Sequence, residues 1–264
     1  MFYNAKEGVA AGAEYIRFGR GARKLVMLPG LGDGLRTMRG TALPIALYYR
    51  CLAKDYTVYM FSRRNELPAG ATTRDMARDL KAAMEELGIE KASVVGVSMG
   101  GMIAQHLAAD HPELVEKLVL VVTAARENPV LLGSLEEWTA CARRDDHRAL
   151  MDSNVRRIYS DGYYRKNRWM IPITGALTKP KSYHRFLVMA EACRIHDAYD
   201  RLPQITAPTL VIGGEQDRSL GGDASREIAA RIPAAELKMY SQWGHGLYEE
   251  AKDFLTVVTD FLGK

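Results

Sequence analysis

The sequence predicts an α/β fold in which a doubly wound, mostly parallel sheet is covered by helices on both faces. Short apolar runs typical of buried strands alternate with longer stretches of helical spacing. The first run, residues 24–28, is continuously apolar after its lysine and ends at Pro29-Gly30, as expected for a strand buried on both faces. A single stretch, residues 128–202, lacks convincing strands and is expected to be a helical insertion.

The remaining strands are predicted from runs rich in β-branched and aromatic residues. The last of them alternates apolar and polar residues, which is typical of an edge strand. These runs cover residues 56–61, 93–97, 118–122, 209–213 and 235–240.

Three stretches of the predicted α/β core have helical spacing. Residues 72–87 carry apolar side chains at helical intervals and are followed by Gly88, a typical C-terminal stop. Residues 100–109 are apolar nearly all round, which predicts a buried helix. Residues 249–262 predict a closing helix with one apolar face.

The insertion divides the predicted core into two segments of the chain. We expect a core of residues 1–127 and 203–264, and a helical unit of residues 128–202 that includes helical pieces at 134–144 and 184–198. Glycines and prolines separate these pieces, and two of the three tryptophans lie among them.

Composition excludes several classes of protein. Of the 264 residues, 47% are hydrophobic and 26% are charged, which rules out a disordered or low-complexity chain. A net charge of +4 does not indicate a nucleic-acid partner. Three widely spaced cysteines predict neither a disulfide framework nor a metal cluster. Without a signal peptide or a long apolar stretch, we expect a cytoplasmic protein with no membrane partner, as a monomer or small homo-oligomer.

The segment from Gly96 to Gly101 carries the first sign of chemistry. A strand ends there and a helix begins, and a sharp turn between them would lift the hydroxyl of Ser98 out of the backbone. The same turn would free the amide of Met99 at the start of the helix. Side chains at Gly96 or Gly100 would press on the adjoining strand or helix, so the spacing predicts a serine nucleophile.

A serine nucleophile needs a base and a carboxylate that orients it. Of the six histidines, His245 lies between glycines in a loop that follows the last predicted strand. Asp217 follows the strand at 209–213, at the same edge of the sheet. The order Ser98, Asp217, His245 predicts a catalytic triad.

With these landmarks the chain resembles the α/β-hydrolase superfamily along nearly its full length. The matching segments are Leu28 to Gly32, Gly96 to Gly101, Gly214 to Asp217, and Gly244-His245. The resemblance implies the α/β-hydrolase fold with a helical cap inserted after the sixth strand. It also implies that the oxyanion hole is formed by the backbone N–H groups of Leu31 and Met99.

The chain departs from the family pattern at two places. Pro29 stands where a histidine is more common, which affects the surroundings of the oxyanion hole but not the backbone donor. After the strand at 56–61 the chain has Ser62-Arg63-Arg64-Asn65, where relatives usually have Asp-x-Arg-Gly.

The resemblance implies a serine hydrolase that cleaves a small carboxylic ester or lactone through an acyl-enzyme on Ser98. The run from Gly96 to Gln105 looks most like small esterases and 3-oxoadipate enol-lactone hydrolases, and the serine excludes dehalogenases and epoxide hydrolases, which use an aspartate. C–C bond hydrolases often carry an asparagine in place of Val97. An acyltransferase or thioesterase, a C–C bond hydrolase with the same triad, and a non-catalytic small-molecule receptor remain alternatives. Neither a cofactor nor a metal is predicted.

Side chains of two kinds are candidates for binding the substrate. Arginines in loops at the catalytic edge could hold a substrate carboxylate, and aromatic residues of the cap could line an apolar pocket. Both groups have alternative roles, as surface arginines or as the cap's own core. The candidates are Arg36, Arg39, Arg63, Trp138, Tyr163, Tyr164 and Trp169.

Overall fold

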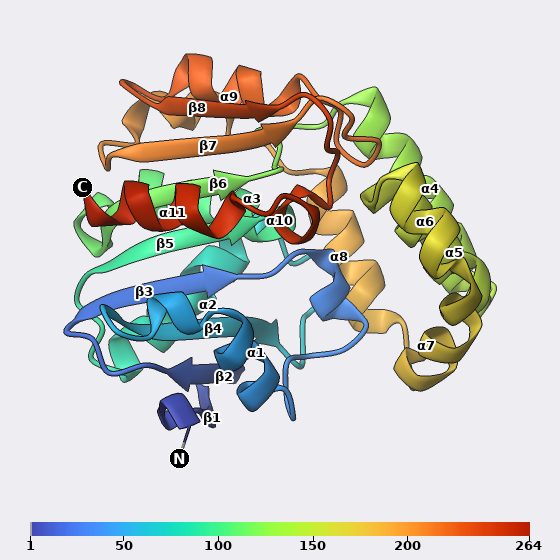
Figure 1. Ribbon diagram of the computed structural model, residues 1–264, viewed down its shortest axis with the longest axis horizontal. Helices are drawn as coiled ribbons and strands as arrows, with labels where there is room; N and C mark the ends of the chain where they lie inside the picture. Colours follow the sequence, from blue (N-terminus) through green and yellow to red (C-terminus); the bar gives the residue numbers. More distant parts are fainter. Residues whose placement is uncertain (1) are drawn as a thin grey trace.

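The computed structural model describes residues 2–264 and contains one eight-stranded sheet in the order β1-β2-β4-β3-β5-β6-β7-β8 (Figure 1). Strands β3 to β8 are parallel, whereas β1 and β2 run antiparallel at one edge. The strands are β1 (Lys6–Ala10), β2 (Ala13–Phe18), β3 (Arg23–Leu28), β4 (Tyr56–Arg64), β5 (Ala92–Val97), β6 (Val115–Val121), β7 (Thr209–Gly214) and β8 (Glu236–Tyr240).

All six predicted strands are confirmed, and β8 lies at the edge of the sheet as expected. The hairpin of β1 and β2 is missing from the prediction. Its turn, Ala11-Gly12, has positive φ at both residues (46° and 78°). Tight turns of this kind usually contain Asn-Gly or Asp-Gly, because alanine rarely adopts a positive φ. The sequence therefore gives no sign of a turn at this position.

Helices cover both faces of the sheet, which confirms the doubly wound arrangement. Helices α2, α3 and α9 pack into one apolar cluster, and α1, α10 and α11 pack into a second cluster on the opposite face (Figure 1). These helices are α1 (Ala42–Tyr48), α2 (Thr73–Glu86), α3 (Met99–Asp110), α9 (Ala224–Arg231), α10 (Leu247–Glu250) and α11 (Phe254–Gly263). Short 3-10 helices are η1 (Phe2–Asn4), η2 (Leu31–Gly34), η3 (Arg50–Leu52), η4 (Pro112–Leu114) and η6 (Tyr199–Gln204).

The predicted helix boundaries agree at α2 and α3 but not at the end of the chain. Helix α2 begins after a capping box formed by Thr72 and Asp75, and Gly88 follows it with a φ of 65°. The prediction of one helix over residues 249–262 is wrong. Ala251 adopts an extended conformation (φ −81°, ψ 114°) that ends α10, and α11 begins at Phe254.

Five α-helices lie between β6 and β7, beyond the ends to which the parallel strands point (Figure 1). In the described chain, residues 128–202 contain no strand, and their sole β-bridge joins Arg126 to Asp197. The helices, with one 3-10 turn among them, are α4 (Pro129–Arg143), α5 (His147–Ile158), α6 (Asp161–Asn167), η5 (Arg168–Met170), α7 (Ile171–Thr178) and α8 (His184–Arg194).

A buried histidine pair makes the stability of this fold sensitive to acid. The rings of His106 and His196 lie 5.1 Å apart, and the Nδ1 of His196 is 2.8 Å from the hydroxyl of Thr73. Burial lowers the pKa of His106 to about 4 and that of His196 to about 3. Both histidines are therefore neutral in the folded protein, whereas in the unfolded chain they gain protons near pH 6.5.

We expect the free energy of unfolding to fall by about 2 kcal/mol for each histidine between pH 7 and pH 5. The loss begins as the pH drops through the unfolded pKa, because the unfolded state then binds protons that the folded state excludes. Urea unfolding at both pH values measures the change, and His106→Gln should remove about half of it. An equal loss in the variant would contradict the assignment.

Candidate active site

Ser98 lies in a sharp turn between β5 and α3. Its φ of 54° and ψ of −122° are strained for a residue with a side chain, and Ser98 is partly exposed. A Cβ on Gly96 would lie 2.6 Å from the carbonyl oxygen of Gly100, and a Cβ on Gly100 would lie 2.1 Å from that of Leu28. Both glycines are therefore required by the close packing of strand and helix, as the sequence predicts.

His245 and Asp217 form a buried hydrogen-bonded pair. The Nδ1 of His245 lies 2.8 Å from Oδ2 of Asp217, and the two side chains are 5% and 3% exposed. The other carboxylate oxygen accepts hydrogen bonds from the amides of Ser219 (2.7 Å) and Leu220 (2.9 Å). Because an ionised carboxylate only accepts, Nδ1 carries the imidazole proton and Nε2 is left as the acceptor.

Glycines allow the loops that carry this pair to touch. Asp217 follows β7 and His245 follows β8, and these strands are neighbours in the sheet. A Cβ on Gly214 would lie 2.5 Å from the carbonyl oxygen of Trp243, and a Cβ on Gly244 would lie 2.6 Å from that of Gln216.

Backbone hydrogen bonds hold the carboxyl ends of the central strands next to each other at one edge of the sheet. The amide of Ser98 donates to Val121 at the end of β6 (2.9 Å), and the amide of Val122 donates to Ile212 in β7 (2.8 Å). Among residues 2–264, Ser98 and His245 share no side-chain hydrogen bond. Such contacts often form only when substrate is bound.

The two backbone amides predicted to form the oxyanion hole stand at the starts of helices. Met99 is the first residue of α3 and Leu31 is the first residue of η2, and the first N–H groups of a helix lack acceptors within it. A Cβ on Gly30 would lie 3.3 Å from the Cβ of Ser98 and 3.7 Å from its Oγ. The loop before Leu31 therefore packs directly against the serine.

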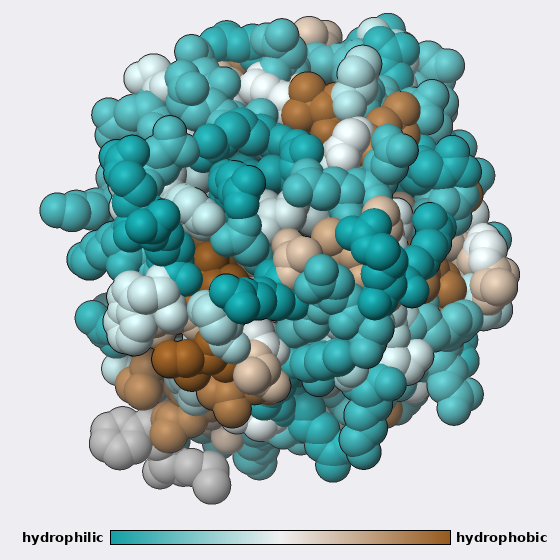
Figure 2. All heavy atoms as spheres, turned by 90° about the vertical axis from the view of Figure 1, so that its right-hand side faces the viewer, coloured by the Kyte–Doolittle hydropathy of each residue, from teal (hydrophilic) through white to brown (hydrophobic). Residues whose placement is uncertain are grey.

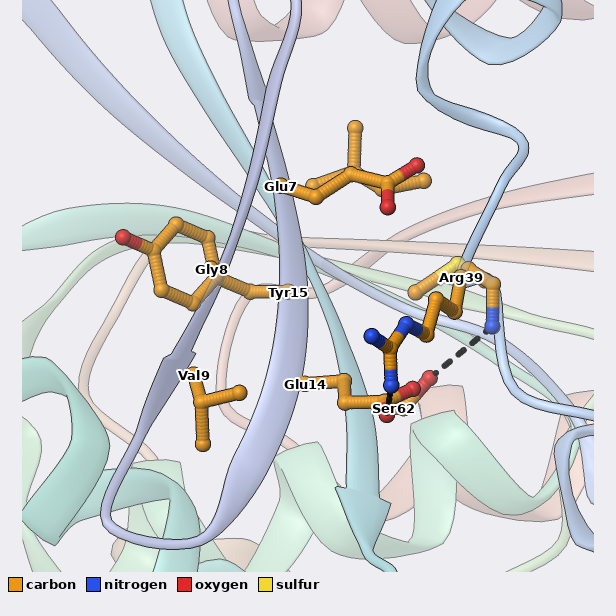
Figure 3. A pocket seen from close by; sticks show the side chains of 9 residues that line it. Glu7, Gly8, Val9, Glu14, Tyr15, Arg39 and Ser62 are labelled. Atoms are coloured by element: carbon orange, nitrogen blue, oxygen red, sulfur yellow. Dashed lines mark hydrogen bonds and ion pairs between the residues drawn. The ribbon is translucent and has the colours of Figure 1, made fainter.

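The candidate arginines occupy three different environments. Arg36 is exposed. Arg39 reaches toward Glu14 (3.8 Å) in a pocket beside the β1–β2 hairpin, as Figure 3 shows, and none of the triad candidates lines that pocket. Arg63 is 5% exposed, and its guanidinium donates to the carbonyl oxygen of Pro29. Its side chain therefore holds the backbone of the chain in place, in contrast to the predicted role as a substrate ligand.

The aromatic candidates are also dispersed. Trp138 is 6% exposed and packs in the apolar core. Tyr163 stacks on Tyr159 with ring centroids 4.1 Å apart, and the hydroxyl of Tyr164 donates to Asp152 (2.8 Å). Trp169 is 67% exposed.

Figure 2 views the molecule from the side of the helical insertion, and this face is mainly hydrophilic with separate apolar patches. The apolar side chains that the insertion exposes most are those of Trp169, Ile173 and Leu177. Roles for Tyr163, Tyr164 and Trp169 in substrate binding stay predictions.

The insertion contacts the loop that carries His245. The amide of Gly246 donates to the carbonyl oxygen of Ile158 at the end of α5 (2.6 Å). The hydroxyl of Tyr159 donates to Glu249 (2.7 Å), and that of Ser160 donates to Glu250 (2.6 Å). Burial and the neighbouring Glu250 raise the pKa of Glu249, although the hydrogen bond from Tyr159 opposes that rise. The sequence does not predict these polar contacts, because no sequence pattern links positions 90 residues apart.

Two kinds of feature are absent from the described part of the chain. Within the described residues, His, Cys, Asp and Glu side chains form no group of three that could hold a metal ion. None of the helices between residues 2 and 264 has the length and apolar character needed to cross a membrane.

Comparison with known proteins identifies the family. Residues 24–252 match the family model described as the alpha/beta hydrolase fold. The chain is 30% identical to a 2-hydroxy-6-oxononadienedioate/2-hydroxy-6-oxononatrienedioate hydrolase of Cupriavidus pinatubonensis, over 93% of this chain and 88% of that protein. It is 31% identical to a 2-hydroxy-6-oxo-6-phenylhexa-2,4-dienoate hydrolase of Comamonas testosteroni, over 89% and 84% of the two chains.

A solved structure gives the same result. The enol-lactonase of Burkholderia xenovorans LB400 superimposes with a TM-score of 0.80 and 25% identity, over 98% of this chain and all of the other. Fold, family model and relatives agree: the chain belongs to the alpha/beta hydrolase family and is a hydrolase.

Proposed function

We propose that Ser98, His245 and Asp217 form the catalytic triad of this hydrolase. The observation that supports it most is the buried 2.8 Å pair of His245 and Asp217, at the same sheet edge as the strained, partly exposed Ser98. A buried carboxylate on Nδ1 fixes the imidazole tautomer and stabilises the imidazolium that forms when Nε2 takes a proton.

The proposed reaction has two steps. The Oγ of Ser98 bonds to the carbonyl carbon while its proton passes to Nε2 of His245, and the leaving group departs with that proton. Water then attacks the acyl carbon and gives a proton to His245, which passes that proton to Oγ of Ser98 as the acyl–oxygen bond breaks, so that the acid and the free serine are released. The amides of Leu31 and Met99 are proposed to stabilise the oxyanion in both steps, with a contribution of about 3–4 kcal/mol each.

We further propose that residues 128–202 act as a cap over this site, on a core of residues 1–127 and 203–264. This division is supported by the position of α4–α8 beyond the strand ends and by the contacts of Ile158 and Tyr159 with the His245 loop. A cap in this position would restrict the entry of water and shape the substrate pocket.

Small carboxylic esters and lactones are the first substrate candidates. Their hydrolysis needs the triad, the oxyanion hole and walls for the acyl group, without further chemical groups. The structural similarity to an enol-lactonase supports this class, as does Val97 at the position before the serine.

Cleavage of a C–C bond next to a carbonyl is the second candidate. The similarity to an enol-lactonase supports lactone hydrolysis, whereas the names of the sequence relatives favour C–C cleavage over ester hydrolysis. The two relatives described above are both named for 2-hydroxy-6-oxo acids. Such substrates carry carboxylates, for which the exposed Arg36 is the candidate ligand.

A panel of three probes distinguishes the candidates. We expect measurable kcat/KM for a phenyl ester, an enol lactone or 2-hydroxy-6-oxo-6-phenylhexa-2,4-dienoate, and the fastest probe defines the class. If Arg36 binds a carboxylate, Arg36→Ala should lower kcat/KM for the dienoate by about 10–100-fold and leave the neutral ester unchanged. The same loss for both probes would exclude that role for Arg36. Failure to hydrolyse any carbonyl substrate would contradict the proposed reaction.

A further inference from the structure

A buried charged cluster holds the loop that begins with Leu31. Asp33, two residues after Leu31 in η2, is 5% exposed. Its Oδ2 accepts a hydrogen bond from the amide of Arg63 (3.0 Å) and another from Nη2 of Arg185 (2.5 Å). We call Asp33, Arg63 and Arg185 the loop clamp.

Arg185 brings helix α8 of the insertion into this cluster. Its guanidinium donates to the carbonyl oxygens of Asp33, Arg63 (2.8 Å) and Arg64 (3.0 Å), as well as to the carboxylate of Asp33. The side chain of Arg185 thus joins η2 to the end of β4. Several N–H donors of its planar guanidinium form hydrogen bonds at the same time.

Close packing connects the loop clamp to the backbone that touches Ser98. A Cβ on Gly34 would lie 2.8 Å from the Cα of Phe186 in α8, so η2 and α8 touch through their backbones. Arg63 donates to the carbonyl oxygen of Pro29, and the next residue, Gly30, packs against Ser98. Leu31 therefore lies between two anchored points, Pro29 and Asp33.

The loop clamp also carries an excess of positive charge. It contains two guanidinium groups and one carboxylate, and within residues 2–264 the Nε and Nη1 of Arg63 have no hydrogen-bond acceptor. Burial lowers the pKa of Arg63 while the charge of Asp33 raises it, and an arginine remains protonated in proteins. A net positive charge behind an oxyanion loop favours the negative charge that develops in front of it.

We propose that Asp33 and Arg185 are positioning residues that set the Leu31 N–H of the oxyanion hole and couple that hole to helix α8. The inference rests on the proposed function, because it assigns a role within that site. Within Ser62-Arg63-Arg64-Asn65, the segment that departs from the family pattern, the backbone carbonyl oxygens of Arg63 and Arg64 accept hydrogen bonds from Arg185, and the side chain of Arg63 donates to Pro29.

Arg185→Met and Arg185→Lys test the inference, with Arg194→Met as the matched control. Arg194 lies on the same helix but pairs with Glu191 at the surface, where ion pairs contribute little. We expect Arg185→Met to lower kcat for an activated ester by about 100-fold with KM nearly unchanged, because a displaced donor affects mainly the transition state. Arg185→Lys should lose less, and Arg194→Met should behave as the wild type.

A boronic acid inhibitor separates positioning from general destabilisation. Its tetrahedral adduct on serine mimics the oxyanion intermediate, so its Ki should rise by the same factor as kcat/KM falls in Arg185→Met. If Arg185→Met does not fold, Asp33→Asn and Arg185→Lys give the same comparison. A lower Tm with unchanged kcat and Ki would overturn the inference. Wild-type protein that neither hydrolyses esters nor binds the boronate would instead overturn the proposed function.

Discussion

Ser98→Ala is expected to lower kcat for an activated ester by about 10⁵–10⁶-fold, the largest effect of any single substitution in this chain. The hydroxyl is the proposed nucleophile, and the methyl group that replaces it can form no acyl-enzyme. Steady-state hydrolysis measures the loss. Thermal unfolding provides the control, because alanine at this partly exposed position removes one oxygen atom and leaves no large cavity.

Residual hydrolysis within about tenfold of the wild type would contradict this assignment. Thr123 offers a matched control close by. Its hydroxyl donates to the carbonyl oxygen of Ser98 (2.8 Å), so Thr123 contacts the backbone of the serine turn without being a proposed nucleophile. Thr123→Val should retain most of the activity that Ser98→Ala loses.

His245→Ala should lose nearly as much activity as Ser98→Ala, because nucleophile and base act as one unit. Asp217→Asn should retain more, with a loss of about 10⁴-fold in kcat, since an amide no longer fixes the same imidazole tautomer. Both changes are measured as kcat on the same ester.

Glu215 provides the control for the acid. It lies two residues before Asp217 but forms an ion pair with Arg226 (2.5 Å). Glu215→Gln should leave kcat within about twofold of the wild type, as expected for a surface pair. A large loss in Glu215→Gln together with near-normal activity in Asp217→Asn would exchange the roles of the two carboxyl groups.

Most of the fold could be predicted because its signals are local. Buried parallel strands such as β3 and β6 are continuous apolar runs, and α2 has an apolar face, a capping box and a glycine stop. The β1–β2 hairpin has no such signals, since β1 is mostly exposed and its turn contains alanine at positive φ. The break between α10 and α11 was also invisible, because the apolar pattern continues across it.

The triad candidates could be predicted for a related reason. Ser98, Asp217 and His245 each follow a recognisable strand, and parallel strands end at one edge. The loop clamp could not be predicted, because Asp33 and Arg185 are 152 residues apart and each looks like an ordinary surface residue in sequence. Burial and pairing, which decide whether an arginine binds substrate or holds a loop, depend on the tertiary structure.

The central claim, that Ser98 is the nucleophile, is tested most directly by intact-protein and peptide mass spectrometry after reaction with a fluorophosphonate. We predict a single covalent adduct on the peptide that contains Ser98, absent from Ser98→Ala and formed much more slowly in His245→Ala. An adduct on another residue, or ester hydrolysis by a wild-type protein that never becomes labelled, would contradict the account.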